Sequence, residues 1–324
     1  MAVRNPIRPA MGVEVLDLRH FSSADLRSLL DQEVQRWGEK LAWDYRSSSE
    51  MILRYIDAKI LPGYAALERG SIVGYSFFVY EGSKGVIGDL FVSPSRGDAR
   101  AVQTNLIEHV VETLQQSPGV QRVEAQLLAQ NTGELAEPFT ANGFHRYRRL
   151  FLCLDLATHP TPKPQSVDGV QIRRWTDADY QPSAGIITAS YRSHIDSEIN
   201  DQYRTAGGSM RFLNNIVRFP GCGVFDPEAS FVALHPPSNS LIGLILCSRV
   251  RDDVGHVTQV CLLPEYRGQG IGENLLAQTC EALRSRKFKL LTLTVTEANR
   301  RAVELYRKLG FETRRVFDAF VWEG

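Results

Sequence analysis

The strongest constraint on the fold of this chain is an internal repeat. The segment GFHRYRRLFLCLDL, residues 143–156, matches the closing segment GFETRRVFDAFVW, residues 310–322, almost position for position. The same order of predicted strands and helices precedes each copy. A single repeat of this length indicates one domain used twice, because solenoid repeats are much shorter. The length of 324 residues agrees with two domains of about 150 residues each.

A proline-rich stretch, THPTPKPQSV, separates the two copies. Its composition predicts an extended linker over residues 158–167. The sequence therefore predicts one domain at residues 13–157 and a second at 168–324. Both read as the same mixed α/β unit.

The second copy shows its elements most clearly. Strands are predicted where β-forming residues gather, and helices where apolar residues recur at helical spacing. Ile271, Leu275, Thr279 and Leu283 mark one such helix, and Gly310 is placed to end the next one. The predicted strands are 171–175, 229–234, 241–250, 256–263 and 290–296.

The charge balance excludes one broad class of function. Lys and Arg number 37, equal to Asp and Glu at 37, so the net charge is zero. Non-specific nucleic-acid binding needs a basic surface, so no nucleic-acid partner is expected. The most apolar stretches are too short to span a bilayer, and the N-terminus lacks the apolar core of a signal peptide. We expect a soluble, cytoplasmic protein with no membrane partner.

The five cysteines are odd in number and form no C-x-x-C pair. This pattern favours buried thiols in a reducing compartment over disulfides or metal ligands. A catalytic cysteine nucleophile is the alternative. The cysteines are Cys153, Cys222, Cys247, Cys261 and Cys280.

The stretch PEYRGQGIG, residues 264–272, lies between a predicted strand and a predicted helix. The first amides of a helix lack internal acceptors, and the helix dipole adds partial positive charge there. Glycines let an anion such as pyrophosphate approach these amides, and Arg267 adds a positive charge. The stretch has neither the Gly-Lys-Ser/Thr of a P-loop nor the glycine spacing of a dinucleotide fingerprint. A flexible turn is the simpler alternative.

Two sequence motifs, which occur in the same order as in the family, resemble those of the GNAT superfamily of N-acetyltransferases. VCLLPEYRGQGIGENLL is similar to its acetyl-CoA signature Arg/Gln-x-x-Gly-x-Gly/Ala, with Arg267, Gly270 and Gly272 at the defined positions. TVTEANRRAVELYRKLGF is similar to a second family block, in which an asparagine precedes a helix that carries a tyrosine. The resemblance covers essentially residues 168–324 and, in degenerate form, about 13–157.

This resemblance implies an α/β (mixed α+β) fold of two tandem domains, each a mixed, mostly antiparallel twisted sheet flanked by helices. It implies transfer of an acetyl group from acetyl-CoA to a primary amine by direct attack, without a metal. The strand before the glycine stretch would splay from its neighbour and hold the pantetheine arm and the carbonyl. The cofactor-binding residues implied in this way are Val260, Cys261, Leu262, Arg267, Gly268, Gln269, Gly270, Ile271, Gly272 and Asn299.

The resemblance also assigns proton transfer. Tyr306 matches the family's general acid, since a phenol is protonated at neutral pH and can donate to a thiolate. A tyrosine that only packs on the sheet is the alternative. His256 stands near the family position of a general base. An exposed histidine at a strand edge is the competing interpretation, Glu297 and Asp253 are rival bases, and many relatives use a water chain instead.

The first copy departs from the signature. In FVSPSRGDARAVQ, Arg96 and Gly97 remain, but Ala99 and Ala101 stand where the second copy has Gly270 and Gly272. The missing middle glycine indicates that the first copy does not turn over acetyl-CoA, and binding of a CoA-like ligand without turnover is the alternative.

The acid is missing from the first copy too. Counting back from Gly143 and Phe144 puts Phe139 where Tyr306 stands, and Pro138 should shorten or kink the helix. The 13–157 domain is therefore predicted to be non-catalytic, with roles in packing and in shaping the acceptor site.

Two functions from different classes follow. The first is an acetyl-CoA-dependent N-acetyltransferase acting on a small molecule or peptide amine; the second is a non-catalytic CoA sensor or scaffold. Family members with tandem domains include enzymes for an amino-sugar thiol precursor, and Asp196, Glu198 and Asp201 suggest a cationic acceptor. A solvated charged face is the alternative. A monomer or a homodimer is compatible with the repeat.

Overall fold

The computed structural model describes residues 12–94, 97–160, 163–218 and 223–324. The chain divides into two compact units. Unit 1 comprises Met1–Leu41, Tyr45–Tyr147 and Phe317–Gly324, and unit 2 comprises Ala42–Asp44 and Arg148–Val316. The predicted Cys222, Arg96 and part of the 158–167 linker fall outside the described residues.

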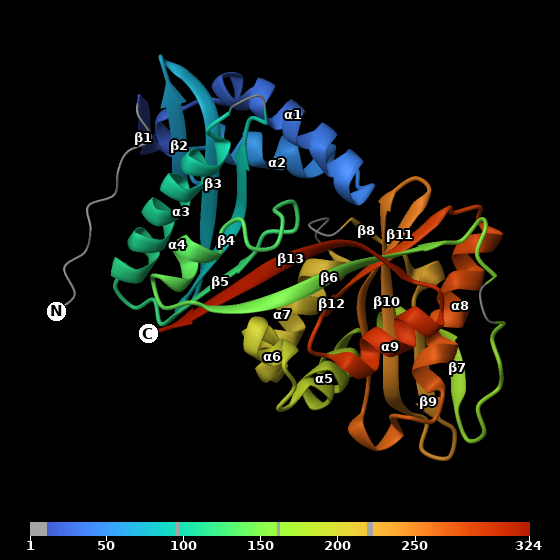
Figure 1. Ribbon diagram of the computed structural model, residues 1–324. Coiled ribbons are helices and arrows are strands. Elements are labelled where there is room, and N and C mark those ends of the chain that lie inside the picture. Colours follow the sequence, from blue (N-terminus) through green and yellow to red (C-terminus); the bar gives the residue numbers. More distant parts are fainter. Residues whose placement is uncertain (1–11, 95–96, 161–162, 219–222) are drawn as a thin grey trace. The chain divides into compact units, whose positions relative to one another are not determined.

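The strands of unit 1 follow the order β1-β2-β3-β4-β5-β13 (Figure 1). Neighbours pair antiparallel except β4 and β5, which run parallel. This mixed, mostly antiparallel sheet agrees with the fold class expected from the sequence. The strands are β1 Val13–Asp17, β2 Gly63–Glu68, β3 Ser71–Glu81, β4 Lys84–Val92, β5 Arg122–Gln126 and β13 Glu312–Glu323, and the helices are α1 Ser23–Leu41, α2 Arg46–Asp57, α3 Ala99–Gln116 and α4 Ala136–Thr140.

Unit 2 repeats this plan in the order β7-β9-β10-β11-β12-β6. As in unit 1, the fourth and fifth strands of the repeat, here β11 and β12, run parallel. The strands are β6 His145–Asp155, β7 Gln171–Arg174, β8 Val224–Phe225, β9 Phe231–His235, β10 Ser240–Arg251, β11 Val254–Leu262 and β12 Leu290–Thr296. The helices are α5 Tyr180–Tyr191, α6 Asp196–Ile199, α7 Ala206–Val217, α8 Ile271–Ser285 and α9 Arg300–Lys308.

Each unit has a hydrophobic core on both faces of its sheet, because alternate residues of a strand point to opposite faces. In unit 1, Leu90 packs with the side chains of α3, while the next residue, Phe91, packs with those of α1 and α2. In unit 2, Val257 packs with α8 and α9, while Cys261 packs with α5 and α7. The repeat predicted from the sequence is thus present as two similarly layered units.

The units differ from the predicted segments chiefly because each sheet takes a strand from the other sequence half; the short segment Ala42–Asp44 also belongs to unit 2. The end of β13 pairs with β5, placing Ala319 opposite Gln126 within unit 1. The end of β6 pairs with β12, placing Leu154 opposite Leu291 within unit 2. The repeated GF segments therefore complete each other's units, an exchange that the boundary at residues 158–167 did not anticipate.

The described part of the predicted linker packs against unit 2. The Gln165 backbone N–H donates to Asn274 Oδ1 at 3.1 Å, and the Asn274 amide donates back to the Gln165 carbonyl. The ring of His159 lies so close to Gly310 that a Cβ there would meet its Nε2 at 2.0 Å. Gly310 also has φ +89°, so glycine is required there both for its conformation and for space.

Two helices of unit 1, α1 and α2, were absent from the sequence expectations, whereas the shortening of α4 was expected. Pro138 lies within α4, which spans Ala136–Thr140, while its counterpart α9 spans Arg300–Lys308. A proline inside a helix removes a donor and clashes with the preceding turn.

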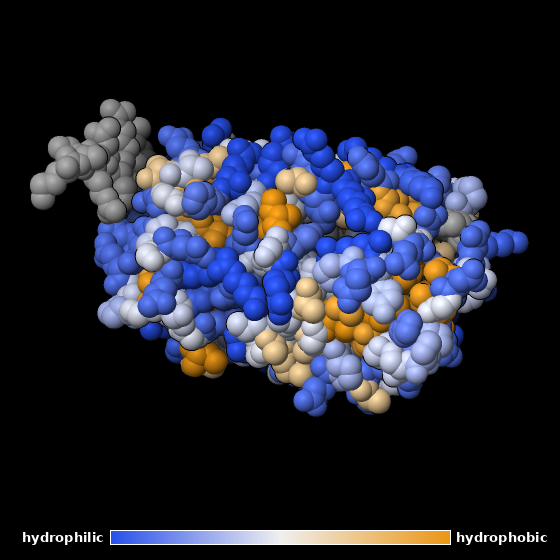
Figure 2. All heavy atoms as spheres, turned by 90° about the horizontal axis from the view of Figure 1, so that it is seen from below, coloured by the Kyte–Doolittle hydropathy of each residue, from blue (hydrophilic) through white to orange (hydrophobic). Residues whose placement is uncertain are grey.

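On the face drawn in Figure 2, hydrophilic side chains dominate and apolar ones form separate small patches. Among the described residues, no helix combines the length and the apolar character needed to cross a bilayer.

Candidate functional site

In unit 2 the strands β11 and β12 diverge along their length. Their parallel pairing runs from Val254 opposite Leu290 to Val257 opposite Leu293 and goes no further. Thr258 bulges out at that point, because Val257 and Gln259 pair with consecutive residues of β10. Beyond it, β11 pairs with β10 and no longer with β12, so the edge facing β12 makes no strand pairing over the predicted residues Val260, Cys261 and Leu262. Side chains contact part of this edge, because the Val260 amide donates to Gln259 Oε1 at 3.0 Å and the Leu262 carbonyl accepts from Arg267. The predicted splay of this strand is therefore present.

The glycine stretch forms the turn from β11 into α8. Gly268 and Gly270 have φ of +84° and +79°, a region that favours glycine. Gly270 is the N-cap of α8, and the first bond into the helix runs from the Asn274 amide to its carbonyl at 3.0 Å. The amides of Ile271 and Gly272 thus precede the first helical donor, have no acceptor within the helix and can bind an anion. A loop of this form suits a pyrophosphate.

Two arginines flank this loop in different ways. The Arg267 guanidinium donates to the backbone carbonyls of Leu262 at 3.2 Å and Ser190 at 2.5 Å, so it ties the loop to the end of α5. Arg301, in α9, instead approaches the loop itself: a Cβ on Gly268 would meet its Nη2 at 2.8 Å. Sequence reasoning missed Arg301, although its neighbour Asn299 was singled out. Gln269 donates to the Glu265 carbonyl at 3.1 Å.

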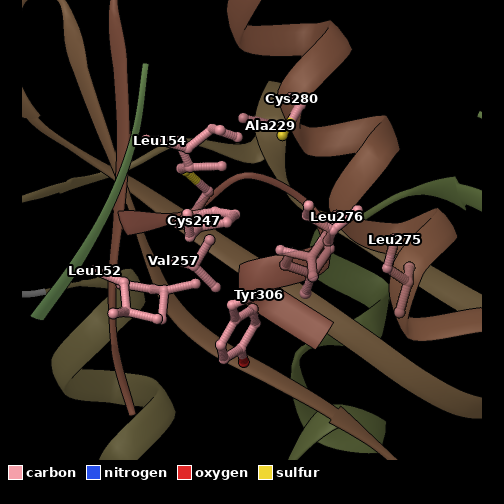
Figure 3. Close-up of a cluster of buried hydrophobic side chains, with 14 of the residues drawn as sticks. Leu152, Leu154, Ala229, Cys247, Val257, Leu275, Leu276, Cys280 and Tyr306 are labelled. Atoms are coloured by element: carbon pink, nitrogen blue, oxygen red, sulfur yellow. The ribbon is translucent and has the colours of Figure 1, made fainter. Parts of the chain in front are cut away.

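Tyr306 extends from α9 into the apolar cluster of unit 2. Its ring lies among Leu152, Val257 and Leu276, and its hydroxyl points away from that cluster (Figure 3). Burial, and to a lesser degree the Asp196 carboxylate, raises the pKa of this phenol. The hydroxyl therefore stays protonated across neutral pH and is available as a proton donor.

Asn299 has two roles at the start of α9. Its Oδ1 accepts from the Ala302 amide at 3.3 Å and so caps the helix. Its amide nitrogen lies 3.4 Å from Nε2 of His194. Asp196 accepts a hydrogen bond from the Thr296 hydroxyl and lies 3.5 Å from the Arg149 guanidinium. The structure thus gathers His194 and Asp196 beside Asn299, and only Asp196 was noted from the sequence.

The predicted base His256 has a different setting. It is only 5% exposed, rather than exposed at a strand edge. Its ring stacks on Phe151 at 6.2 Å, meets Trp43 edge-on at 4.8 Å, and Nδ1 contacts the Thr292 hydroxyl at 2.9 Å. Burial lowers the pKa of His256 to about 3. It points to the opposite face from its neighbour Val257, which packs with Tyr306, so the geometry does not support the base assignment.

The rival bases are engaged elsewhere. Glu297 lies 3.1 Å from the Arg148 guanidinium, and Asp253 pairs with Arg251 at 2.6 Å and with Lys289 at 3.5 Å. Burial raises the pKa of the Cys261 thiol to about 12, so this cysteine is an inert thiol at neutral pH. Over the described residues, no group of three or more His, Cys, Asp or Glu side chains is placed to hold a metal ion.

Unit 1 carries the same splay without the same loop. Its parallel pairing ends at Ile87 opposite Ala125, and its bulge falls at Gly88. Its buried phenylalanine Phe139 stacks on Phe320 with ring centroids 4.1 Å apart. No hydroxyl replaces that of Tyr306 at this position.

The helix after the splayed strand shows where the loop was lost. Leu114 of α3 and Leu283 of α8 are equivalent, because each fills the space beside a glycine at the start of the parallel pair, Gly85 or Gly255. The residue thirteen positions before each leucine is Ala101 in unit 1 and Gly270 in unit 2. The packing therefore aligns Ala101 with Gly270, whereas the sequence motif predicted that Ala99 would be the counterpart of Gly270. Ala99–Gln116 is helical throughout, so helix replaces the glycine loop.

With this geometry in view, comparisons with known proteins are informative. Residues 197–311 match the model of the Acetyltransferase (GNAT) family. A mycothiol acetyltransferase of Thermobifida fusca is 39% identical over 97 residues, which are 27% of this chain and 30% of that protein. A mycothiol acetyltransferase of Thermomonospora curvata is 28% identical over 279 residues, covering 83% of this chain and 85% of that protein. The first alignment thus spans less than a third of the relative's length.

Two solved structures resemble the fold over almost the whole chain. A GCN5-related N-acetyltransferase from Sphaerobacter thermophilus has a TM-score of 0.69 at 16% identity and covers 97% of this chain and 96% of its own. A tandem GNAT protein from the clavulanic acid biosynthesis pathway has a TM-score of 0.59 at 17% identity, with coverages of 96% and 98%. At these identities the likeness concerns the fold, which includes the tandem arrangement.

Proposed function

Because the chain belongs to the GNAT acetyltransferase family through residues 197–311, we propose that it transfers an acetyl group from acetyl-CoA to a primary amine. The reaction takes place in unit 2. The observation that carries this proposal is the divergence of β11 from β12 at Val257, beside the ring of Tyr306. A strand edge released from β12, an anion-binding turn and a proton donor then lie within one unit, on β11, at the start of α8 and on α9.

Different residues of unit 2 bind the cofactor, polarise the thioester carbonyl and transfer the proton. The amides at the start of α8 and the Arg301 guanidinium bind the pyrophosphate, while Arg267 holds the loop to Ser190. The unpaired edge of β11 binds the pantetheine arm and polarises the thioester carbonyl. The amine nitrogen attacks that carbon directly, the C–S bond breaks, and Tyr306 protonates the departing thiolate. An un-ionised Cys261 thiol favours this direct route over a cysteine-bound acyl intermediate.

Unit 1 serves as a non-catalytic partner domain in this proposal. Helix replaces the glycine loop from Ala99 onward, and the N-cap position holds Asp98, whose carboxylate disfavours a phosphate. Phe139 offers no proton where Tyr306 offers one. Unit 1 therefore has neither a suitable site for the pyrophosphate nor an acid that could protonate the departing thiolate.

The test is a turnover screen of the full-length protein. Acetyl-CoA is incubated with an amino-sugar thiol precursor, polyamines, aminoglycosides and peptides with free N-termini, and released CoA thiol is measured against samples without amine. We expect thiol release that depends on one class of amine, with the acetylated product identified by mass spectrometry. Saturable acetyl-CoA binding with no thiol release for any amine would indicate a CoA sensor instead.

A further inference from the structure

The turn between α5 and α6 holds a histidine in an unusual backbone setting. Ser193, directly before His194, has φ +58°, a left-handed conformation that non-glycine residues seldom adopt. Such strain persists where the surrounding structure fixes it, and it gathers at functional sites. The His194 carbonyl accepts from both the amide and the hydroxyl of Ser197, at 2.9 and 2.6 Å. The ring also meets Tyr191 edge-on, with centroids 5.2 Å apart. The orientation of this side chain is therefore fixed.

The neighbours of the ring hold it in its neutral form. The Asp196 backbone N–H lies 3.2 Å from Nδ1, and the Asn299 amide nitrogen, a donor because Oδ1 caps α9, lies 3.4 Å from Nε2. A neutral imidazole has a lone pair for only one of these donors, and an imidazolium has none. Burial also lowers the pKa of His194, which favours the neutral imidazole as well.

The same surroundings can stabilise a proton once it has arrived. The carboxylate Oδ2 of Asp196 lies 3.6 Å from Nδ1, and the side chain of His194 remains 24% exposed. The charges that act on the ring are this carboxylate, which favours the imidazolium, and the more distant Arg267 guanidinium, which opposes it. The uncharged groups against it are Tyr191 and the Asn299 amide. A neutral ring with an adjacent carboxylate is the arrangement of a general base.

We propose that His194 takes the proton from the ammonium group of the acceptor, and that Asp196 positions it. This inference rests on the proposed acetyl transfer and names its missing base. The ammonium N–H bond breaks, its proton goes to an imidazole nitrogen, and its electron pair becomes the lone pair that forms the N–C bond. The C–S electrons leave on sulfur, which takes the Tyr306 proton, and the second surplus proton on nitrogen restores the phenol. The His194 proton then passes to water.

The position of His194 agrees with this role. It contacts Asn299, a predicted cofactor-arm residue, and Asp196 is close enough to Tyr306 to raise the pKa of that phenol. Base and acid are therefore linked through one carboxylate. His256, the base expected from the sequence, has no such link.

The test compares His194→Gln with His235→Gln, a matched change at a histidine of the same unit whose ring contacts the Ser238 hydroxyl and lies 6.2 Å from the Tyr266 ring, centroid to centroid. With acetyl-CoA and the amine that gives most turnover in the screen, we expect kcat of His194→Gln to fall about 100-fold or more. The acidic limb of its pH–rate profile should disappear, and acetyl-CoA affinity by calorimetry should stay within about threefold. His235→Gln should match the wild type.

A second variant separates chemistry from folding. In His194→Ala, added imidazole should restore part of the lost rate, in proportion to its neutral form, which a structural role does not explain. Turnover of His194→Gln within twofold of the wild type, or an unchanged acidic limb, overturns the inference and leaves the proposed transferase intact. If imidazole restores no rate in a folded His194→Ala, the inference is likewise overturned. A wild-type protein that acetylates no amine overturns both.

Discussion

At the scale of single residues, Tyr306 and His256 show how burial decides the use of a titratable group. Both are largely buried side chains of unit 2, at 6% and 5% exposure. Burial raises the pKa of a phenol, so Tyr306 carries its proton at neutral pH, as a proton donor must. Burial lowers the pKa of an imidazole to about 3 in His256, which leaves it neutral among aromatic rings. Of these two residues, Tyr306 is the one that carries a transferable proton, and its hydroxyl points out of the apolar cluster (Figure 3).

Tyr306→Phe tests that role. The change removes the hydroxyl and keeps the ring in the cluster with Val257, so we expect kcat to fall about 100-fold with little loss of stability. Acetyl-CoA affinity should be nearly unchanged, because the hydroxyl is not needed until the thiolate forms. The measurements are steady-state kinetics and calorimetric binding. Equal losses of affinity and rate would contradict the assignment of Tyr306 as the acid.

At the scale of elements, the turn from β11 into α8 is the part of the site that depends most on local sequence. Gly268 and Gly270 take positive φ, and the amides that follow lack helical acceptors. The equivalent stretch of unit 1 has alanines and is helical from Ala99. A few residues thus decide whether this connection is an anion-binding turn or one more turn of helix, because alanine favours helix and glycine does not.

Gly270→Asp should abolish this anion site. An aspartate there is strained at φ +79° and places a carboxylate at the helix N-terminus, where the phosphates would lie. Strain of about 1–2 kcal/mol destabilises the turn, and the added carboxylate repels the phosphates, so we expect acetyl-CoA to bind at least about tenfold more weakly. The measurement is the dissociation constant of acetyl-CoA by calorimetry.

Gly97→Asp is the matched control, because it adds the same charge beside α3 of unit 1, where a Cβ meets nothing within 4 Å. We expect it to leave the affinity for acetyl-CoA unchanged. Normal affinity in Gly270→Asp would reject the phosphate-loop assignment.

At the scale of the whole molecule, the two units are defined by exchanged strands as well as by sequence order. Phe317–Gly324 belongs to unit 1, where β13 pairs with β5. Phe320 is 2% exposed and stacks on Phe139 of the same unit. The last residues of the chain therefore contribute to the core of the first unit.

Phe320→Ala distinguishes this arrangement from two separate sequence domains. Removing a buried phenylalanine costs about 3–5 kcal/mol, and that loss should appear in unit 1 although residue 320 is in the second sequence half. Hydrogen exchange of the full chain should accelerate in β2 to β5, while the amides of β10 and β11 keep their protection. Tyr80→Ala, at a 49% exposed aromatic residue of unit 1, is the control. Faster exchange confined to unit 2 would refute the exchange of strands.

The features that depend on neighbours along the chain could be predicted from the amino-acid sequence. The repeat, most strands, the shortened helix at Pro138, and the turn at Gly268 and Gly270 could all be predicted, because propensity, periodicity and φ are local properties. The acid Tyr306 was predicted from its motif alone, and its role remains to be tested.

Which distant segments lie side by side could not be predicted from the sequence and is seen in the folded chain. Strand pairing is non-local, so the exchange of β6 and β13 could not be read from two similar endings. A strand points alternate residues to opposite faces, which placed His256 away from the face of Tyr306 despite its suitable position in the sequence. His194 and Asn299 lie 105 residues apart in the chain. They become neighbours because the turn that holds His194 packs against the start of α9, which Asn299 caps.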